Sequence, residues 1–458
     1  MTSPSLLIRG GQTVEAAGLS RRDLLIQGET IVAAGDLLGV RADRVVDADG
    51  LWLLPGGVDT HVHFNDEFMG TVSVHDYEKG TRAAAFGGTT TIVDFSNQRP
   101  GRPLRQTLDE KREEARTALV DWGVHPVITR ADDRTLDEIP GLIRQGVPTF
   151  KCYMTYRDEG IMTEAPDLRR ILIRLREAGG MLLVHAEDND VAEANISRLI
   201  SEGRTAPIFH ARSKPTSCED AAIERAVRIA EETGGRLFIV HLASAAGLDI
   251  ITRARDRGVG VATETCTHYL AFSEACLEGE DGLKFICSPP LRPASVQEAL
   301  WRGVADGRIA QVSSDDAADS WGAKLLGRDR FDRCPNGLPG VELRLPLLFS
   351  LGVAAGRITP GRFVELVSTN PAKIFGLYPR KGCLEPGSHA DILFWDPAAK
   401  WTLTASNHHL ATDWSPVEAM DLTGRIRRVY SRGELIVDGD RCTAEPGRGR
   451  FVFRRLPS

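Results

Sequence analysis

The chain has 458 residues, a formal net charge of −7 and 26% charged residues. This length exceeds that of one ordinary domain and favours a large catalytic core with a smaller domain beside it. The charge is mild and no block of lysine and arginine stands out, so the sequence gives no electrostatic footprint for nucleic acid or for anionic lipid, and we expect neither as a partner. The net charge alone does not identify a binding partner.

The N-terminal segment MTSPSLLIRGG lacks a basic region followed by an apolar stretch and a cleavage site. No uninterrupted apolar run is long enough to span a bilayer, so no membrane association is expected. The eight cysteines show no CxxC spacing, which is typical of reduced packing thiols rather than of a disulfide framework or a metal site. We therefore expect a soluble protein of the cytoplasm.

Strand and turn signals fill both ends of the chain. Near the N-terminus the runs LLIRGGQTV, DLLIQGETIVAAG and RVVDADGLWLLPG are each broken by Gly or Asp. The same pattern returns after Pro379 in KGCLEPGSHADILFWDP and RIRRVYSRGELIVDGD. Each group alone is too short to bury two faces of a sheet. We predict that residues 1–55 and 379–458, the latter with a C-terminal tail, form one small β-sandwich domain.

Residues 56–378 alternate short apolar strands with longer amphipathic stretches, which is the signature of repeated βα units. Eight candidate strands follow one another: GGVDTHVHF, TTTIVDFS, WGVHPVI, VPTFKCYM, MLLVHAE, RLFIVHLA, GVATETCTHYL and IAQVSSDD. Eight such units predict an α/β fold, a TIM (β/α)8 barrel.

Potential metal ligands recur at the ends of these predicted strands, where a TIM barrel builds its active site. His61 and His63 close the first strand, and their spacing of two puts both imidazoles on one side. The further candidates are Lys151 in the fourth strand, His185 ending the fifth, His241 ending the sixth and Asp315 ending the eighth. We expect these six ionisable groups to converge at one rim.

An isolated histidine is most often a core or surface residue bonded to the backbone. The remaining seven keep that interpretation: His75, His125, His210, His268, His389, His408 and His409. That interpretation fails for the ligand set, because independent strands would have to place metal-binding side chains at equivalent ends by accident.

Four imidazoles, one carboxylate and a bridging anion suit two divalent ions, zinc first, with manganese, cobalt and nickel as alternatives. Such a pair can activate water and polarise a carbonyl, which predicts a hydrolase. Lys151 is the odd member of the set, because an ammonium would repel the ions it faces. It therefore needs to be modified or moved.

The motifs resemble the hydantoinase, dihydropyrimidinase, allantoinase and dihydroorotase group of the amidohydrolase superfamily. The similarity runs from PGGVDTHVHF through FMGTVSVHDYEKGTRAAAFGGTTTIVDF, TFKCYMTY, VHAE, VHLAS, ETCTHYL, SPPLR and NGLPGVELRLPLLFS to STNPAKIFGLYPRKG and GSHADILFWDP. The resemblance implies that Lys151 is N6-carboxylated and bridges both metals as a carbamate. It also implies a more buried ion held by His61, His63, Asp315 and the carbamate, and an exposed ion held by His185, His241 and the carbamate.

The resemblance further implies roles for the side chains around the metals. Asp315 would act as general base and then protonate the leaving nitrogen. The Tyr156 hydroxyl would donate a hydrogen bond to the substrate carbonyl oxygen, where negative charge develops. Ser288 and Asn336 would contact the ring amide, largely through backbone groups. The implied reaction opens a dihydropyrimidine or 5-substituted hydantoin ring to an N-carbamoyl amino acid.

Two alternatives stay open. FMGTV, KCYMTY, SPPLR and PNGLPGVE favour a dihydropyrimidinase or hydantoinase, whereas HVHFN and THYL are more similar to allantoinase or dihydroorotase. An allantoinase or another ureide-ring hydrolase is therefore the alternative enzyme. The alternative of another class is a non-catalytic scaffold, because relatives with this fold act as interaction proteins after losing metal ligands. Here every ligand position is filled.

Two further expectations come from the resemblance. A homotetramer, or a dimer, is implied, with contacts supplied by the segment from Leu384 onward. Asp316 departs from the family pattern, because relatives usually have His directly after the catalytic Asp. An additional carboxylate there is expected to alter the pKa of the base or the product site.

Overall fold

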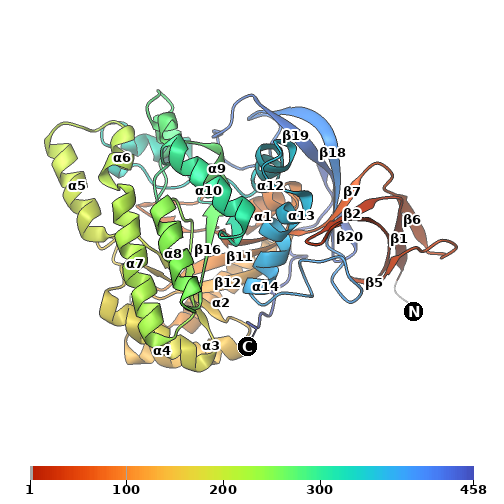
Figure 1. Cartoon of the computed structure of the whole chain (residues 1–458), viewed down its shortest axis with the longest axis horizontal. Helices are drawn as coiled ribbons and strands as arrows, with labels where there is room; N and C mark the ends of the chain where they lie inside the picture. Colours follow the sequence, from red (N-terminus) through yellow and green to blue (C-terminus); the bar gives the residue numbers. More distant parts are fainter. Residues whose placement is uncertain (1–3, 100, 458) are drawn as a thin grey trace.

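The computed structural model describes residues 4–99 and 101–457. It confirms the predicted barrel, an eight-stranded parallel sheet surrounded by helices (Figure 1). The strands are β8 (Gly57–Val62), β11 (Thr89–Asn97), β12 (Asp121–Val127), β13 (Thr149–Tyr153), β14 (Met181–His185), β15 (Leu237–Ile239), β16 (Val261–Cys266) and β17 (Gln311–Ser313). Each strand pairs with the next along the chain, and a parallel bridge between Val62 and Asp316 joins the last strand to the first. The ring of strands is thereby closed.

Helices cover the outside of this ring (Figure 1). The longer ones are α1 (Tyr77–Phe86), α2 (Leu104–Glu114), α3 (Asp133–Arg144), α4 (Ala165–Ala178), α5 (Asn189–Ser201), α7 (Thr216–Thr233), α8 (Ala245–Asp256) and α10 (Ala294–Asp306). Shorter ones are α6 (Ile208–Ser213), α9 (Thr267–Ala271), α11 (Trp321–Lys324), α12 (Arg344–Leu348), α13 (Pro360–Val364) and α14 (Asn370–Ile374).

Helix α4 shows how the sequence specifies such a helix. It buries Leu168, Ile171, Leu172 and Leu175, whose spacing of three and four residues forms one apolar stripe. A proline lies in its first turn, and Gly179 ends it with a left-handed φ of 77°. The buried stripe holds the helix against the barrel.

The two ends of the chain share a sheet at one side of the barrel (right in Figure 1). Its strands, in spatial order, are β21 (Arg441–Cys442), β20 (Glu434–Asp438), β19 (Met420–Ser431), β18 (Ile392–Leu403), β7 (Trp52–Pro55), β2 (Gln12–Glu15) and β3 (Gly18–Arg21). A second sheet contains β5 (Thr30–Gly35), β4 (Asp23–Gln27), β1 (Ser5–Arg9) and β6 (Arg44–Asp47).

The pairing of β18 with β7 joins the two ends directly. The strands are antiparallel, with Ile392 opposite Pro55 and Trp395 opposite Trp52. Phe394 and Leu53 pack with Ile8 of β1 in a core separate from that of the barrel. The additional β domain built from both ends of the chain is thus confirmed, while its boundaries at residues 55 and 379 stay a prediction.

The chain after β21 returns to the barrel at the amino-terminal ends of β12 and β13. The Trp122 N–H donates to the Arg450 carbonyl at 2.9 Å, and the Val452 N–H donates to the Trp122 carbonyl at 2.7 Å. The buried guanidinium of Arg454 donates to Thr149 Oγ1 at 2.8 Å and to the Val124 carbonyl at 2.5 Å. This tail therefore closes the end of the barrel opposite to the carboxyl ends of the strands.

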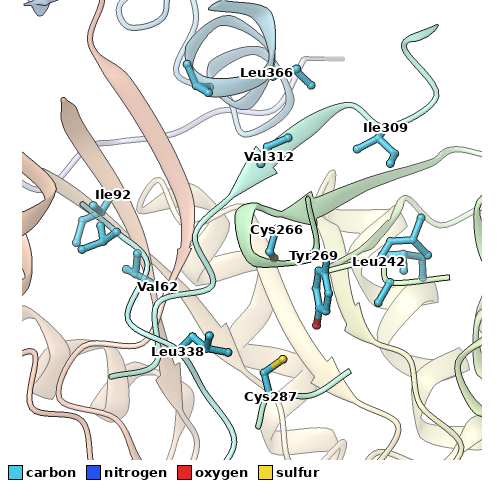
Figure 2. Packing of buried hydrophobic residues seen from close by; sticks show 14 of the residues in the cluster. Val62, Ile92, Leu242, Cys266, Tyr269, Cys287, Ile309, Val312, Leu338 and Leu366 are labelled. Carbon is cyan, nitrogen blue, oxygen red and sulfur yellow. The ribbon is translucent and has the colours of Figure 1, made fainter. Parts of the chain in front are cut away.

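Besides a smaller buried cluster that contains Phe95, Val127 and Phe238, the barrel strands and helices share one large apolar core. Figure 2 shows part of it, with Val312 of β17 near Leu366 and with Cys266 and Cys287 among the packing side chains. All eight cysteines are free thiols in this structure. Within the described part of the chain, no helix has the length and apolar character needed to cross a membrane.

Candidate active site

The six predicted ligands lie together at the carboxyl ends of the barrel strands. His61 Nε2 is 2.9 Å from Asp315 Oδ1, and His63 Nε2 is 3.5 Å from the same oxygen. The ring of His241 lies 5.5 Å from that of His61 and 4.4 Å from that of His185. Ligand atoms of His61, His241 and Asp315 all lie within 4.8 Å of one another. Residues far apart in the sequence thus share one small volume.

Lys151 lies in this group with its amine fully buried. Its side chain is 0% exposed, and its Nζ has no hydrogen-bond partner among the described residues. Burial lowers the pKa of Lys151 to about 8. An unpaired buried ammonium is costly, whereas a neutral amine can react with carbon dioxide to give an anion that metal ions would neutralise. The environment of Lys151 therefore fits the predicted carbamate.

Three of the four histidines are held by carboxylates through the ring nitrogen that faces away from the group. The pairs are His61 Nδ1 with Glu264 Oε1 at 2.5 Å, His63 Nδ1 with Asp66 Oδ2 at 2.9 Å, and His185 Nε2 with Glu187 Oε2 at 2.7 Å. A carboxylate in this position fixes the tautomer and direction of an imidazole, as is typical of metal-ligating histidines. The donor set therefore fits divalent metal ions.

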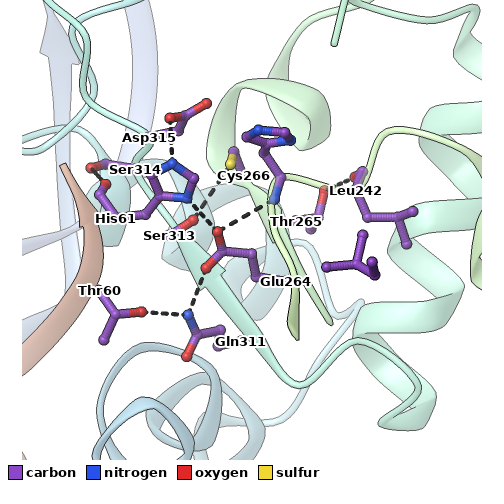
Figure 3. Close-up of polar contacts among 12 residues, drawn as sticks. Thr60, His61, Leu242, Glu264, Thr265, Cys266, Gln311, Ser313, Ser314 and Asp315 are labelled. Atoms are coloured by element: carbon purple, nitrogen blue, oxygen red, sulfur yellow. Dashed lines mark hydrogen bonds and ion pairs between the residues drawn. The ribbon is translucent and has the colours of Figure 1, made fainter. Parts of the chain in front are cut away.

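Glu264 lies at the centre of a polar network beneath the ligands (Figure 3). Gln311 Nε2 donates to Glu264 Oε2 at 2.6 Å and to Thr60 Oγ1 at 2.7 Å. The backbone N–H of His241 donates to Glu264 Oε1 at 3.3 Å. Since these residues come from β8, β16, β17 and the end of β15, the network holds the strands that carry the ligands in register.

Charge in the site is distributed by burial and by these pairs. Although burial opposes its ionisation, the His61, His63 and His241 imidazoles hold the pKa of Asp315 well below its usual range. Burial lowers the pKa of His185 to about 4 and holds that of His241 well below its usual range. Both rings are therefore neutral at physiological pH, which is the form that binds metals.

A cavity of about 770 Å³, including its open mouth, lies above the ligands. Its wall contains the three predicted substrate contacts, Tyr156, Ser288 and Asn336, together with Asp315 and Lys151. The volume suits a small ring with a substituent. The structure thus brings every predicted site residue to one cavity or directly beneath it.

Backbone strain is concentrated at the same place. Tyr156, His241 and Asp315 adopt left-handed φ angles of 67°, 38° and 50°. Such conformations cost on the order of 1–3 kcal/mol each and persist only where the surroundings over-determine them. Three of the predicted site residues have such strained backbones, which indicates that the function of the site requires their positions.

The comparisons with known proteins agree with this geometry. The model of the amidohydrolase family matches residues 52–436. The chain belongs to the amidohydrolase family. A D-hydantoinase of Geobacillus stearothermophilus is 39% identical over 455 residues, covering 98% of this chain and 96% of the relative. A D-phenylhydantoinase of Escherichia coli is 41% identical over 455 residues, covering 98% of both.

A solved structure of a similar protein has the same fold as this chain. That of the dihydropyrimidinase from Brevibacillus agri NCHU1002 matches this amidohydrolase with a TM-score of 0.97 at 37% identity, covering 99% of both chains. The hydantoinase group that the motifs resemble is therefore confirmed.

Several site residues of this amidohydrolase were missed by the sequence analysis. Lys214 Nζ donates to Ser288 Oγ at 2.9 Å and to Glu187 Oε2 at 3.1 Å, and lies 5.0 Å from the Tyr156 ring centre. His268, interpreted above as an ordinary core or surface histidine, lines the cavity and has an unpartnered Nε2 among the described residues. Only Glu187 carried a local signal, because it follows His185 by two residues and so shares its side of the extended chain.

Proposed function

We propose that this chain hydrolyses the ring amide of a 5-substituted hydantoin or a dihydropyrimidine to give an N-carbamoyl amino acid. The observation that carries the proposal is the buried Lys151 amine, which has no hydrogen-bond partner among the described residues and lies with four imidazoles and Asp315. The names of the similar proteins, D-hydantoinase, D-phenylhydantoinase and dihydropyrimidinase, support the same reaction.

Two divalent ions, zinc first, with manganese, cobalt and nickel as alternatives, would be held by His61, His63, His185, His241, Asp315 and carboxylated Lys151. When bound, they would supply Lewis acidity to the scissile carbonyl and make water nucleophilic at neutral pH. The lowered pKa of Lys151 supports carboxylation, because the neutral amine attacks carbon dioxide, forms a C–N bond and releases one proton.

The protein side chains move the proton and hold the ring. Asp315 takes a proton from the attacking water and delivers it to the ring nitrogen as the C–N bond breaks. Tyr156 donates to the carbonyl oxygen as it gains negative charge. Burial raises the pKa of Tyr156, although the Lys214 ammonium opposes the shift, so its hydroxyl stays protonated and able to donate. Ser288 and Asn336 hold the ring amide.

The proposal is tested by metal analysis and turnover on the same purified sample. The substrates are dihydrouracil, hydantoin, 5-substituted hydantoins and allantoin, with ring opening followed directly. Two metals per chain and turnover of dihydrouracil or the hydantoins are expected. Turnover of allantoin alone would replace the hydantoinase assignment by an allantoinase, and a metal-free inactive chain would favour the scaffold alternative.

Carboxylation has its own measurement. Carbon-13 NMR of protein equilibrated with labelled bicarbonate should give one carbamate resonance. Lys151→Met should lose that resonance and both metals, whereas Lys373→Met at a surface lysine should keep them. A wild-type sample that binds two metals without the resonance would refute the carbamate.

Assembly and location complete the proposal. A homotetramer or dimer with contacts from Leu384 onward follows from the resemblance. A cytoplasmic location is in keeping with the free thiols. Sedimentation equilibrium of the metal-loaded protein would give the subunit number.

A further inference from the structure

The carboxylate of Asp316 lies outside the cavity in which the neighbouring Asp315 is proposed to act. Asp315 lines the cavity, whereas Asp316 is 0% exposed and is not part of the cavity wall. Asp316 Oδ1 accepts hydrogen bonds from the backbone N–H groups of Gly340 at 2.7 Å and Val341 at 3.0 Å. Its Oδ2 lies 2.6 Å from Nδ1 of His75, which is also 0% exposed. Asp316 is thus a buried acceptor of three bonds.

The direction of the bond to His75 follows from its other nitrogen. The backbone N–H of Ala411 donates to His75 Nε2 at 3.1 Å, so Nε2 is the acceptor. In a neutral imidazole the proton then lies on Nδ1, which donates it to Asp316. A chain of donors therefore runs from Ala411 through His75 to Asp316 and leaves no polar atom of the pair without a partner.

The backbone of Asp316 connects the same carboxylate to the site on both sides. The His63 N–H donates to the Asp316 carbonyl at 2.8 Å, and the Ala317 N–H donates to the Leu338 carbonyl at 3.1 Å. His63 is a proposed ligand, and Leu338 lies two residues after Asn336. Asp316 therefore links the ligand end of β8 and the substrate-contacting segment 336–341 to the backbone that carries Asp315.

We propose that the Asp316–His75 pair is a positioning device that sets Asp315 against the 336–341 segment. Asp315 holds a φ of 50°, a conformation that its own preferences do not maintain. The three hydrogen bonds at the next residue supply the constraint. Asp316 and His75 do not touch the substrate ring and act on it only through Asp315 and Asn336. The inference rests on the proposed function, because it gives Asp315 and Asn336 their roles.

Asp316→Asn is the first variant, because an amide offers one acceptor oxygen to three donors. We expect kcat to fall about 10- to 100-fold, as a displacement near 1 Å does in such sites. The visible spectrum of the cobalt-loaded protein should change, since Asp315 and His63 both lie beside the altered bonds.

Asp391→Asn is the matched control. Asp391 is another buried aspartate, and it accepts from the Arg432 N–H at 2.7 Å and from Lys381 Nζ at 2.7 Å, outside the cavity. It should lower the melting temperature without altering kcat, KM or the cobalt spectrum.

Exchanging the pair tests the geometry directly. In His75→Asp/Asp316→His the longer imidazole stands at position 316, where one ring N–H would donate to the new Asp carboxylate and the other nitrogen would accept from the Gly340 N–H. The Val341 and Ala411 N–H groups lose their acceptors, since both bonded atoms that the wild-type side chains supply. We expect the exchange to recover at least tenfold in kcat over Asp316→His alone and to restore the cobalt spectrum.

Two results would overturn the inference. One is an Asp316→Asn protein whose kcat, KM and cobalt spectrum are the same as those of the Asp391→Asn control. The other is an exchange variant no better than Asp316→His. A wild-type protein that opens none of the rings would instead refute the proposed function, while the cobalt spectra and melting temperatures would still decide whether the pair positions Asp315.

Discussion

Tyr156 shows how one side chain is prepared by its neighbours. Its ring lies against the Lys214 ammonium, and Lys214 is in turn bonded to Ser288 and Glu187. The same lysine therefore supports a proposed oxyanion donor and a proposed ring contact.

Tyr156→Phe should lower kcat by about 10²–10³ and leave KM nearly unchanged, because the hydroxyl is proposed to bond most strongly in the transition state. Steady-state kinetics on the ring that the wild type opens would measure this. Tyr430→Phe, in the β domain, is the matched control and should keep full activity. A Tyr156→Phe enzyme within threefold of wild type would remove the tyrosine from the mechanism.

His210 predicts a pH dependence of stability. Its buried Nε2 donates to the Cys287 carbonyl at 2.8 Å, and burial lowers its pKa from 6.5 to about 3. Between these values the unfolded chain binds a proton that the folded chain does not, so stability falls as pH drops below 6.5. The slope is about 1.4 kcal/mol per pH unit.

Urea unfolding at pH 6.5 and pH 5 should therefore show a loss of about 2 kcal/mol from this residue. His210→Gln keeps a donor for the carbonyl and should reduce the loss by that amount. An unchanged pH dependence in the variant would show that His210 is protonated in the folded state.

At the scale of elements, Arg344 joins the first and last barrel strands from α12. It is 0% exposed and donates to the carbonyls of Val58 at 3.2 Å and Val312 at 3.1 Å. Its Nε lies 3.5 Å from Oδ2 of the buried Asp59.

Arg344→Leu should lower the free energy of unfolding by about 3–5 kcal/mol, because it leaves Asp59 as an unpaired buried charge. Adding Asp59→Asn should return part of that loss. Denaturant unfolding of the three proteins would test this, and equal stability of the single and double variants would show that the ion pair is not the cause.

The strands could be predicted from the sequence because their signals are local. The run TTTIVDFS and strand β11 (Thr89–Asn97) nearly coincide, since apolar and β-branched residues specify a buried strand wherever it lies. The convergence of His61 and Asp315 could also be predicted, because the barrel brings all strand ends to one rim.

The partners of these residues could not be predicted. Glu264 and His61 are 203 residues apart, and Asp316 and His75 are 241 apart, so no local pattern connects them. Their pairing depends on the register and tilt of strands across the barrel. Lys214 was missed for the same reason, because it enters the site from the segment between α6 and α7.

At the scale of the whole molecule, the C-terminal tail contributes to the stability of the barrel. Val452 and the partly buried Phe451 each contribute about 1.5–3 kcal/mol by burial of apolar surface. Truncation after Glu445 should therefore lower the free energy of unfolding by about 3–6 kcal/mol, as measured in urea. Arg455→Ala, at an exposed side chain, is the control and should change little. Truncated protein with wild-type stability would show that the tail only rests on the barrel.

The position of this tail also sets an order of events during synthesis. Arg454 bonds to Val124, a residue made 330 positions earlier in the same chain. At roughly 5–20 residues per second, that separation is on the order of tens of seconds of translation. The barrel strands are complete at Ser313, whereas Trp122 receives its backbone partners Arg450 and Val452 only when the end of the chain has emerged from the ribosome, so the start of β12 stays uncovered until then and is open to chaperones.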